Sequence, residues 1–161
     1  MSFYHAFSLL RHFVLSESSS SRRSDDIYVR NILQVISTGF ESGEFTMAAS
    51  VARTAMLADR RAITVTDLGT GGRSGQKRKI CDIAAVSALS QRYGVILSGL
   101  VSSEFENETA DSGIILELGT SLGISTLYMA AAAPHIRIIT VEGCEASLSV
   151  AGKNFSEAGF P

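Results

Sequence analysis

Hydrophobic positions in the last third of the chain change period in a way that predicts alternating strands and helices. The apolar run from Ile114 to Leu118, β-branched at its start, is typical of a strand covered on both faces. A turn containing two glycines follows, and residues 124–133 then have the composition of a helix. A second strand is predicted at 136–141 and a second helix at 145–158. This order predicts an α/β fold with a parallel sheet.

The pattern before residue 112 is mainly helical. Helices are predicted at 25–36, 45–61 and 80–93, the last of them ending at Gly94. Residues 95–105 fit a helix or a strand, and we favour a helix because it continues the helical approach to the first sheet strand. We therefore interpret residues 25–111 as a mainly helical extension that precedes the α/β segment at 112–161.

The first 24 residues form a separate segment in this interpretation. Apolar residues at positions 3, 7, 10 and 14 predict an amphipathic helix over residues 1–15. A docking helix is favoured over a targeting peptide, because the apolar run is short and has no basic start. Residues 16–24 are rich in serine and are interpreted as a linker.

The turn between the first strand and its helix carries the candidate chemistry. Gly119 and Gly123 bracket this turn, where a side chain would block the backbone path or a bound ligand. Thr120 or Ser121 is expected to cap the helix, whose N–H groups would face a ligand over the loop. The next strand ends on Glu142, 23 residues beyond Gly119. This is close to the spacing of roughly 20 for an acid that binds ribose hydroxyls in a nucleotide-binding βαβ unit.

The glycine spacing argues against two common nucleotide sites. A dinucleotide loop needs G-x-G-x-x-G, but its central glycine is replaced by Ser121. A P-loop needs a lysine directly after its last glycine, and none follows Gly123. The pattern present is E-x-G-x-x-x-G-x-S, which runs from Glu117 to Ser125. An ordinary turn whose glycines only permit close packing remains the alternative.

This pattern resembles the first motif of the class I S-adenosylmethionine-dependent methyltransferases, and Val141-Glu142-Gly143 resembles their second. The string from Leu116 to Thr126, with Tyr128-Met129-Ala130 behind it, is similar to a bacterial branch of that superfamily. The resemblance implies a Rossmann-like parallel sheet, S-adenosylmethionine as the cofactor, and methyl transfer to a nucleophile by in-line displacement. The motifs that carry the resemblance lie in the last part of the chain, and the helical part before them resembles the family only loosely.

The resemblance also implies roles for individual residues. Glu142 would accept hydrogen bonds from the ribose hydroxyls, and Glu117 would face the ammonium group of the ligand directly or through water. Glycines in the turn would let the backbone approach the methionine and ribose. The implied cofactor-binding residues are Glu117, Gly119, Thr120, Ser121, Gly123, Ser125, Glu142 and Gly143. No general base can be named.

Residues 63–72 form a second stretch of this kind, in which a β-branched run and an acid, Asp67, are followed by glycines. It lacks a partner strand that ends in an acid at the right distance, so we do not assign the cofactor to it. Asp67 is kept as a candidate for the acceptor pocket. The basic residues that follow, including Lys77, Arg78 and Lys79, are compatible with an acidic or phosphorylated ligand, although a solvated flexible loop is favoured.

The remaining strands of such a sheet have no counterpart before Pro161, so we expect the sequence to be the N-terminal part of a longer protein. The 161-residue chain alone is then expected to bind S-adenosylmethionine weakly or not at all and to show no detectable transfer. An unpaired strand edge would also favour self-association.

Composition limits the classes of partner and the cellular compartment that we expect for this chain. A net charge of −2 gives no basic surface for nucleic acid, so a small-molecule acceptor is expected. No apolar run approaches the roughly 20 residues needed to span a bilayer. Two cysteines fit a reducing, cytoplasmic location, and the three histidines show no metal-ligand spacing. Two rival classes stay open, a nicotinamide-dependent oxidoreductase and a non-catalytic Rossmann-like binding module.

Overall fold

The structure, a computed structural model, describes residues 30, 33–36, 44–66, 75–109 and 112–160. The chain divides into two compact units, Met1–Ser37 and Thr38–Pro161. Residues 30 and 33–36 of the first unit are helical, as predicted for that part of the 25–36 helix. The predictions for residues 1–29 and for Asp67 lie outside the described residues. The second unit contains both predicted motifs.

The α/β part of the second unit has the predicted element order. Strands β3 (Ile114–Leu118) and β4 (Arg137–Val141) pair in parallel, with Ile114 opposite Arg137 and Leu118 opposite Val141. Helix α6 (Ile124–Ala132) connects the strands, and α7 (Glu145–Glu157) follows β4. Each boundary lies within one residue of its prediction. The fold is therefore mixed α/β with a small parallel sheet.

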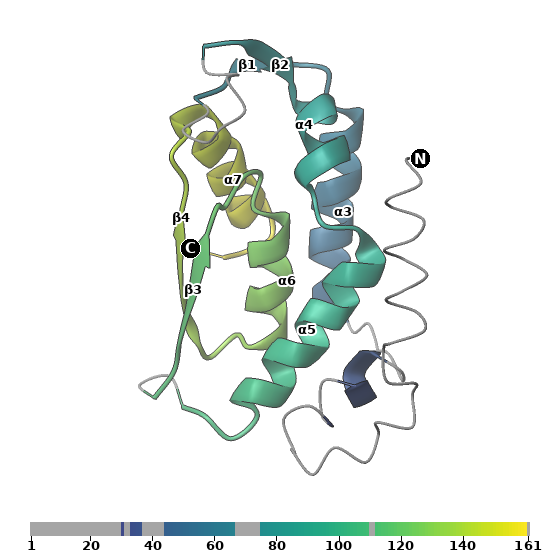
Figure 1. Cartoon of the computed structure of the whole chain (residues 1–161), viewed down its shortest axis with the longest axis vertical. Helices are drawn as coiled ribbons and strands as arrows, with labels where there is room; N and C mark the ends of the chain where they lie inside the picture. The colour runs from purple at the N-terminus through teal and green to yellow at the C-terminus, as the bar shows by residue number, and fades with distance from the viewer. Residues whose placement is uncertain (1–29, 31–32, 37–43, 67–74, 110–111, 161) are drawn as a thin grey trace, which may run out of the picture. The chain divides into compact units, whose positions relative to one another are not determined.

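Helices cover one side of this sheet. Helix α6 lies between the sheet and a second group of helices, namely α3 (Glu44–Ala58), α4 (Ile80–Ser87) and α5 (Gln91–Phe105) (Figure 1). Tyr128 on α6 is fully buried, and its ring lies against Gly94 on α5. A Cβ atom on Gly94 would lie 2.3 Å from Cε2 of that ring, so a glycine is required for α5 and α6 to pack this closely.

The predicted single helix from Ile80 to Tyr93 is wrong. The chain leaves the helix after Ser87, because Ala88 and Ser90 have extended backbone angles, and it re-enters a helix at Gln91. Gly94, predicted to end the helix, lies inside α5. The helical alternative for residues 95–105 is correct. Within the described ranges no single helix is long and apolar enough to cross a membrane; α4 and α5 meet this length and composition criterion only together, and they are bent by 58° at their junction.

The favoured interpretation of Lys77–Lys79 as a loop is also wrong. These residues form β2, which pairs antiparallel with β1 (Ala62–Thr64). The hairpin forms because Val65 enters the core and its backbone exchanges hydrogen bonds with Gln76 (3.0 Å) and Gly75 (2.8 Å). Alternation then leaves Ile63 and Arg78 half-buried, while Lys77 and Lys79 are exposed.

Strand β3 is not covered on both faces, contrary to the expectation from its apolar sequence. Ile115 and Glu117 are half-buried on the side of α6, whereas Ile114, Leu116 and Leu118 are exposed. The reason is that the described helices lie on one side of the sheet and β4 is the one strand paired with β3 among the described residues.

Candidate functional site

The turn after β3 is tied to the end of β4 by its backbone. The N–H groups of Gly119 and Thr120 both donate to the carbonyl of Val141, at 2.8 and 3.2 Å, and Gly123 N–H donates to the carbonyl of Thr120 at 2.8 Å. Gly119, Ser121 and Gly123 have φ angles of +99°, +49° and +80°. The turn is therefore tight, and three of its residues have left-handed backbone angles. It lies at the carboxyl ends of two adjacent parallel strands, which is where α/β folds bind ligands.

The two glycines of the turn differ in their surroundings. A Cβ atom on Gly123 would lie 2.5 Å from Cε1 of Phe155 on α7, so this glycine is needed for close packing as well as for its backbone angle. A Cβ atom on Gly119 would meet nothing within 4 Å. Open space thus lies over the tip of β3, where the backbone of Gly119 is accessible to a ligand.

Glu142 turns from the end of β4 onto this loop. Its Oε2 atom accepts the N–H of Ser121 at 2.7 Å, and its Oε1 atom accepts the N–H of Cys144 at 2.8 Å. A carboxylate offers about four acceptor positions, so two backbone bonds leave it able to accept further hydroxyl groups. Glu142 is half-buried, so part of the side chain reaches solvent. Gly143, the last residue of the second motif, is exposed beside it.

Glu117 has a different set of partners. Its carboxylate accepts the hydroxyls of Ser125 (2.5 Å), Thr126 (2.5 Å) and Thr140 (2.6 Å). The hydroxyl of Thr140 also bonds that of buried Thr120 at 2.6 Å. Glu117 therefore links the first turn of α6 to both strands. Its contact with a ligand ammonium group stays a prediction.

The capping prediction for Thr120 and Ser121 is wrong. Gly123 is the N-cap of α6, and no side chain caps this helix. The hydroxyl of Ser121 lies 3.0 Å from that of Ser87 at the end of α4, and the hydroxyl of Thr120 is used by Thr140. The left-handed conformation of the turn carries both side chains away from the helix N-terminus.

Sequence reasoning missed Thr140 and Cys144, which complete the site. Thr140 is the register partner of Glu117, and a polar residue between Ile139 and Val141 was the available signal. Cys144 is buried between the Glu142 turn and β1, where its Sγ accepts the N–H of Thr66 at 3.3 Å. Burial raises the pKa of the Cys144 thiol, but hydrogen bonds from Ser147, Thr66 and Ala146 outweigh it and leave the pKa below its ordinary value.

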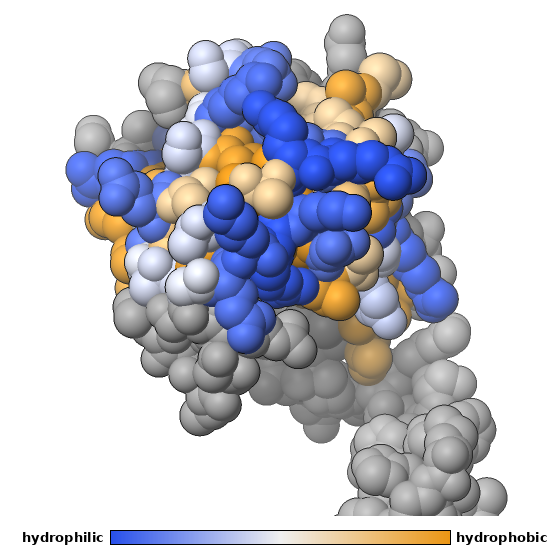
Figure 2. All heavy atoms as spheres, turned by 90° about the horizontal axis from the view of Figure 1, so that it is seen from above, coloured by the Kyte–Doolittle hydropathy of each residue, from blue (hydrophilic) through white to orange (hydrophobic). Residues whose placement is uncertain are grey.

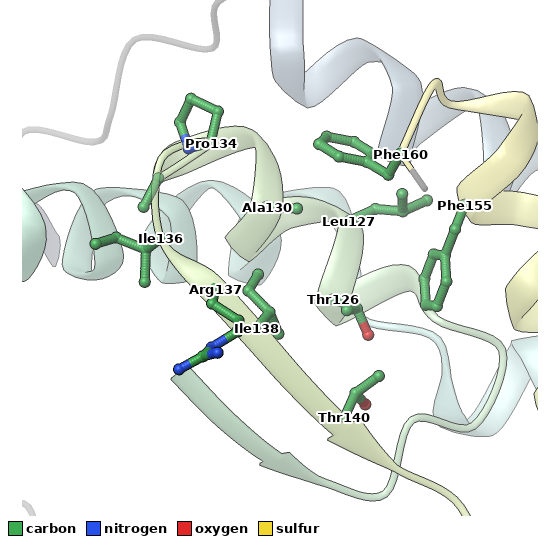
Figure 3. A pocket seen from close by; sticks show the side chains of 11 residues that line it. Thr126, Leu127, Ala130, Pro134, Ile136, Arg137, Ile138, Thr140, Phe155 and Phe160 are labelled. Atoms are coloured by element: carbon green, nitrogen blue, oxygen red, sulfur yellow. The ribbon is translucent and has the colours of Figure 1, made fainter. Parts of the chain in front are cut away.

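A hollow of about 360 Å³ lies on the helix side of β4 (Figure 3). Its lining is largely apolar and includes Leu127, Ile138, Phe155 and Phe160. Neither the 119–123 turn nor Glu142 contributes to it, but Thr126 and Thr140, two of the hydroxyl partners of Glu117, line it. The hollow therefore borders the candidate site on the side of Glu117.

The described residues contain no group of three or more His, Cys, Asp or Glu side chains able to hold a metal ion. Comparisons with protein-family models, curated proteins and solved structures found no match to this chain. The methyltransferase resemblance therefore rests on the two sequence motifs, and the geometry of the turn is the structural observation that bears on it.

Proposed function

We propose that the Thr38–Pro161 unit binds S-adenosylmethionine at the turn after β3 and supplies the cofactor-binding part of a methyltransferase that acts on a small molecule. One observation carries this proposal, the 2.7 Å hydrogen bond from Ser121 N–H to the Glu142 carboxylate. It places the acid of the second motif directly against the loop of the first. A ligand held by one motif would then be within reach of the other.

Glu142 and Gly119 each have a binding role that the geometry allows. Glu142 keeps acceptor positions for the two ribose hydroxyls, and such charge-assisted hydrogen bonds are selective for a diol. Gly119 leaves room for the ligand to approach the backbone at the tip of β3. When bound, S-adenosylmethionine supplies an electrophilic methyl group on a sulfonium. The protein contributes mainly by holding that group in line with the acceptor.

The geometry disfavours a dinucleotide at this site. A pyrophosphate needs free backbone N–H groups and a glycine at the centre of the loop. Here Ser121 stands at that position, and its N–H is already bonded to Glu142. The remaining alternative is a non-catalytic module in which the two backbone bonds of Glu142 only brace the turn.

The proposal is tested by calorimetric titration of the chain with S-adenosylmethionine, S-adenosylhomocysteine and NAD. We expect weak binding of the first two and none of NAD. Glu142→Ala should weaken binding by about 1.5–3 kcal/mol, the scale of a hydrogen bond to a charged group. Gly119→Val should weaken it at least as much, because valine strains the backbone at a φ of +99° and fills the open space.

Glu145→Ala is the matched control, because Glu145 is an exposed carboxylate in the first turn of α7. It should leave the affinity nearly unchanged. If both the Glu142 and the Gly119 variants kept the affinity of the original chain, the turn would be a structural connection only.

A further inference from the structure

The β1–β2 hairpin carries a local concentration of positive charge. The described residues from Asp59 to Asp82 contain these two carboxylates and five cations, which are Arg60, Arg61, Lys77, Arg78 and Lys79. The whole chain has a net charge of −2, so this positive balance is a local feature and not a property of the chain as a whole. Figure 2 shows hydrophilic residues gathered around a smaller apolar area where the unit is viewed from its hairpin side.

The two lysines of β2 are available to an anion. Arg61 is already paired with Asp59, through Nε at 2.9 Å, and Arg78 donates to the backbone carbonyl of Asp82 at 3.5 Å. Within the part of the chain that the structure describes, Lys77 and Lys79 form no ion pair, and both are exposed. Their register partners Thr64 and Ala62 are small residues on the same face, so nothing bulky from β1 covers the ammonium groups.

A hollow of about 380 Å³ adjoins strand β1 of the hairpin. Its lining is apolar over most of its extent, with side chains from α3, β1, α4 and α7, namely Met56, Ala62, Ile63, Ile80, Ala146 and Val150. Arg61, Ser149 and Lys153 complete it. Lys153 lines the hollow directly, and Lys79 is the register partner of Ala62, which is one of the lining residues.

Lys153 can serve a bound anion as well. It pairs with Glu157 at 3.5 Å, but both side chains are more than half exposed, at 58% and 63%. Surface pairs of this kind add little to stability, so Lys153 can change partners at little cost. The bidentate Arg61–Asp59 pair stays intact in this arrangement, and Lys79 and Lys153 supply the charge.

We propose that this hollow binds a small molecule with an apolar body and an anionic oxygen head, either a phosphate or a carboxylate. The volume lies within the roughly 300–1,000 Å³ of ordinary ligand pockets. The apolar lining would bury the body of the molecule, and the two lysine ammonium groups would bind its head. This inference stands on the hollow and its cations, and it is independent of the cofactor proposed above.

Calorimetric titration of the chain with three probes tests the inference. The probes are phenyl phosphate, 3-phenylpropanoate and the neutral 3-phenylpropanamide. We expect the two anions to bind at least about tenfold more tightly than the amide, and the tighter anion identifies the preferred head group. The double variant Lys79→Gln/Lys153→Gln should lose about tenfold in affinity for the anions and little for the amide.

The matched control is Arg92→Gln/Arg30→Gln, which removes the same charge from an exposed position on α5 and from an exposed helical position of the first unit. A second variant, Ser149→Phe, fills the hollow from an exposed position on α7 and should abolish binding of all three probes. The inference is overturned if the amide binds as tightly as the anions, if the control loses as much as the lysine variant, or if Ser149→Phe keeps full affinity. Absence of binding by every probe up to about 10 mM would overturn it too.

Discussion

The two faces of the β3–β4 sheet come from similar apolar sequence but have different surroundings. On the inner face, Glu117 and Thr140 are half-buried beneath α6 and bonded to each other. On the outer face, Ile114, Leu116 and Leu118 are 50%, 62% and 79% exposed. Side-chain hydrophobicity therefore does not tell the two faces apart. The covered face is marked by its polar residues, because polar groups at buried positions need hydrogen-bond partners.

The largest effect should come from removing the polar centre of the inner face. Glu117→Ala leaves three hydroxyls without their acceptor, so we expect the free energy of unfolding to fall by about 2–4 kcal/mol. Leu118→Thr on the outer face should change it by no more than about 0.5 kcal/mol. Urea denaturation of both variants measures the contrast. Equal stability of the two would mean that the faces do not differ as described.

The two glycines of the turn should also differ in how much their substitution lowers the free energy of unfolding. Gly123→Ala adds a Cβ atom 2.5 Å from Phe155 at a φ of +80°, and it should cost about 2–4 kcal/mol in unfolding free energy. Gly119→Ala meets only backbone strain, because its Cβ would have no neighbour within 4 Å, and it should cost about 1–2 kcal/mol. Thermal unfolding of both variants gives the order, and a larger loss at Gly119 would contradict the packing described for Gly123.

The outer face should govern self-association. We expect copies of the chain to associate through this apolar face and the unpaired edge of β3, which carries no proline and no outward charge. Leu116→Thr/Leu118→Thr should weaken association by about tenfold or more in sedimentation velocity. Val86→Thr, an equally apolar exposed position on α4, is the control. A chain that is monomeric at every concentration would refute this use of the outer face.

The smallest expected effect is a pH dependence at Cys144. Its pKa is lowered in the folded state, so between that value and the ordinary 9.0 the unfolded chain binds more protons. The free energy of unfolding should therefore rise with pH across this window, and the contribution is lost as pH falls through the folded pKa. Cys144→Ala should remove the slope, whereas Cys81→Ser should keep it. Urea denaturation at several pH values measures both.

Sequence reasoning located the α/β elements because their hydrophobic periods are long and undisturbed. It placed β3 correctly, and the apolar pattern of the second strand put Glu142 at the end of β4. It did not find the partners of Glu117, since Ser125, Thr126 and Thr140 meet only after α6 folds back onto the strands. Those contacts are tertiary, and no local propensity encodes them.

The helical region was predicted less well for a physical reason. The break at Ala88–Ser90 contains no proline or glycine. The extended backbone there separates α4 and α5, which both pack against α3 and are bent by 58° relative to each other. Strand β2 was missed because Lys77, Arg78 and Lys79 have low strand propensity, and their partner strand β1 leads into Val65, which is buried in the core. In both cases tertiary packing overrides the local signal.

The central claim is that the turn after β3 and Glu142 together bind S-adenosylmethionine. Amide chemical shifts of the ¹⁵N-labelled chain during titration with S-adenosylhomocysteine test it most directly, because they detect weak binding and locate it. We expect saturable shifts at Gly119, Thr120, Ser121 and Gly143, with none of comparable size on the β1–β2 hairpin, and we expect these shifts to be lost in Glu142→Ala. Shifts absent from this turn at saturating ligand, or equally large with NAD, would contradict it.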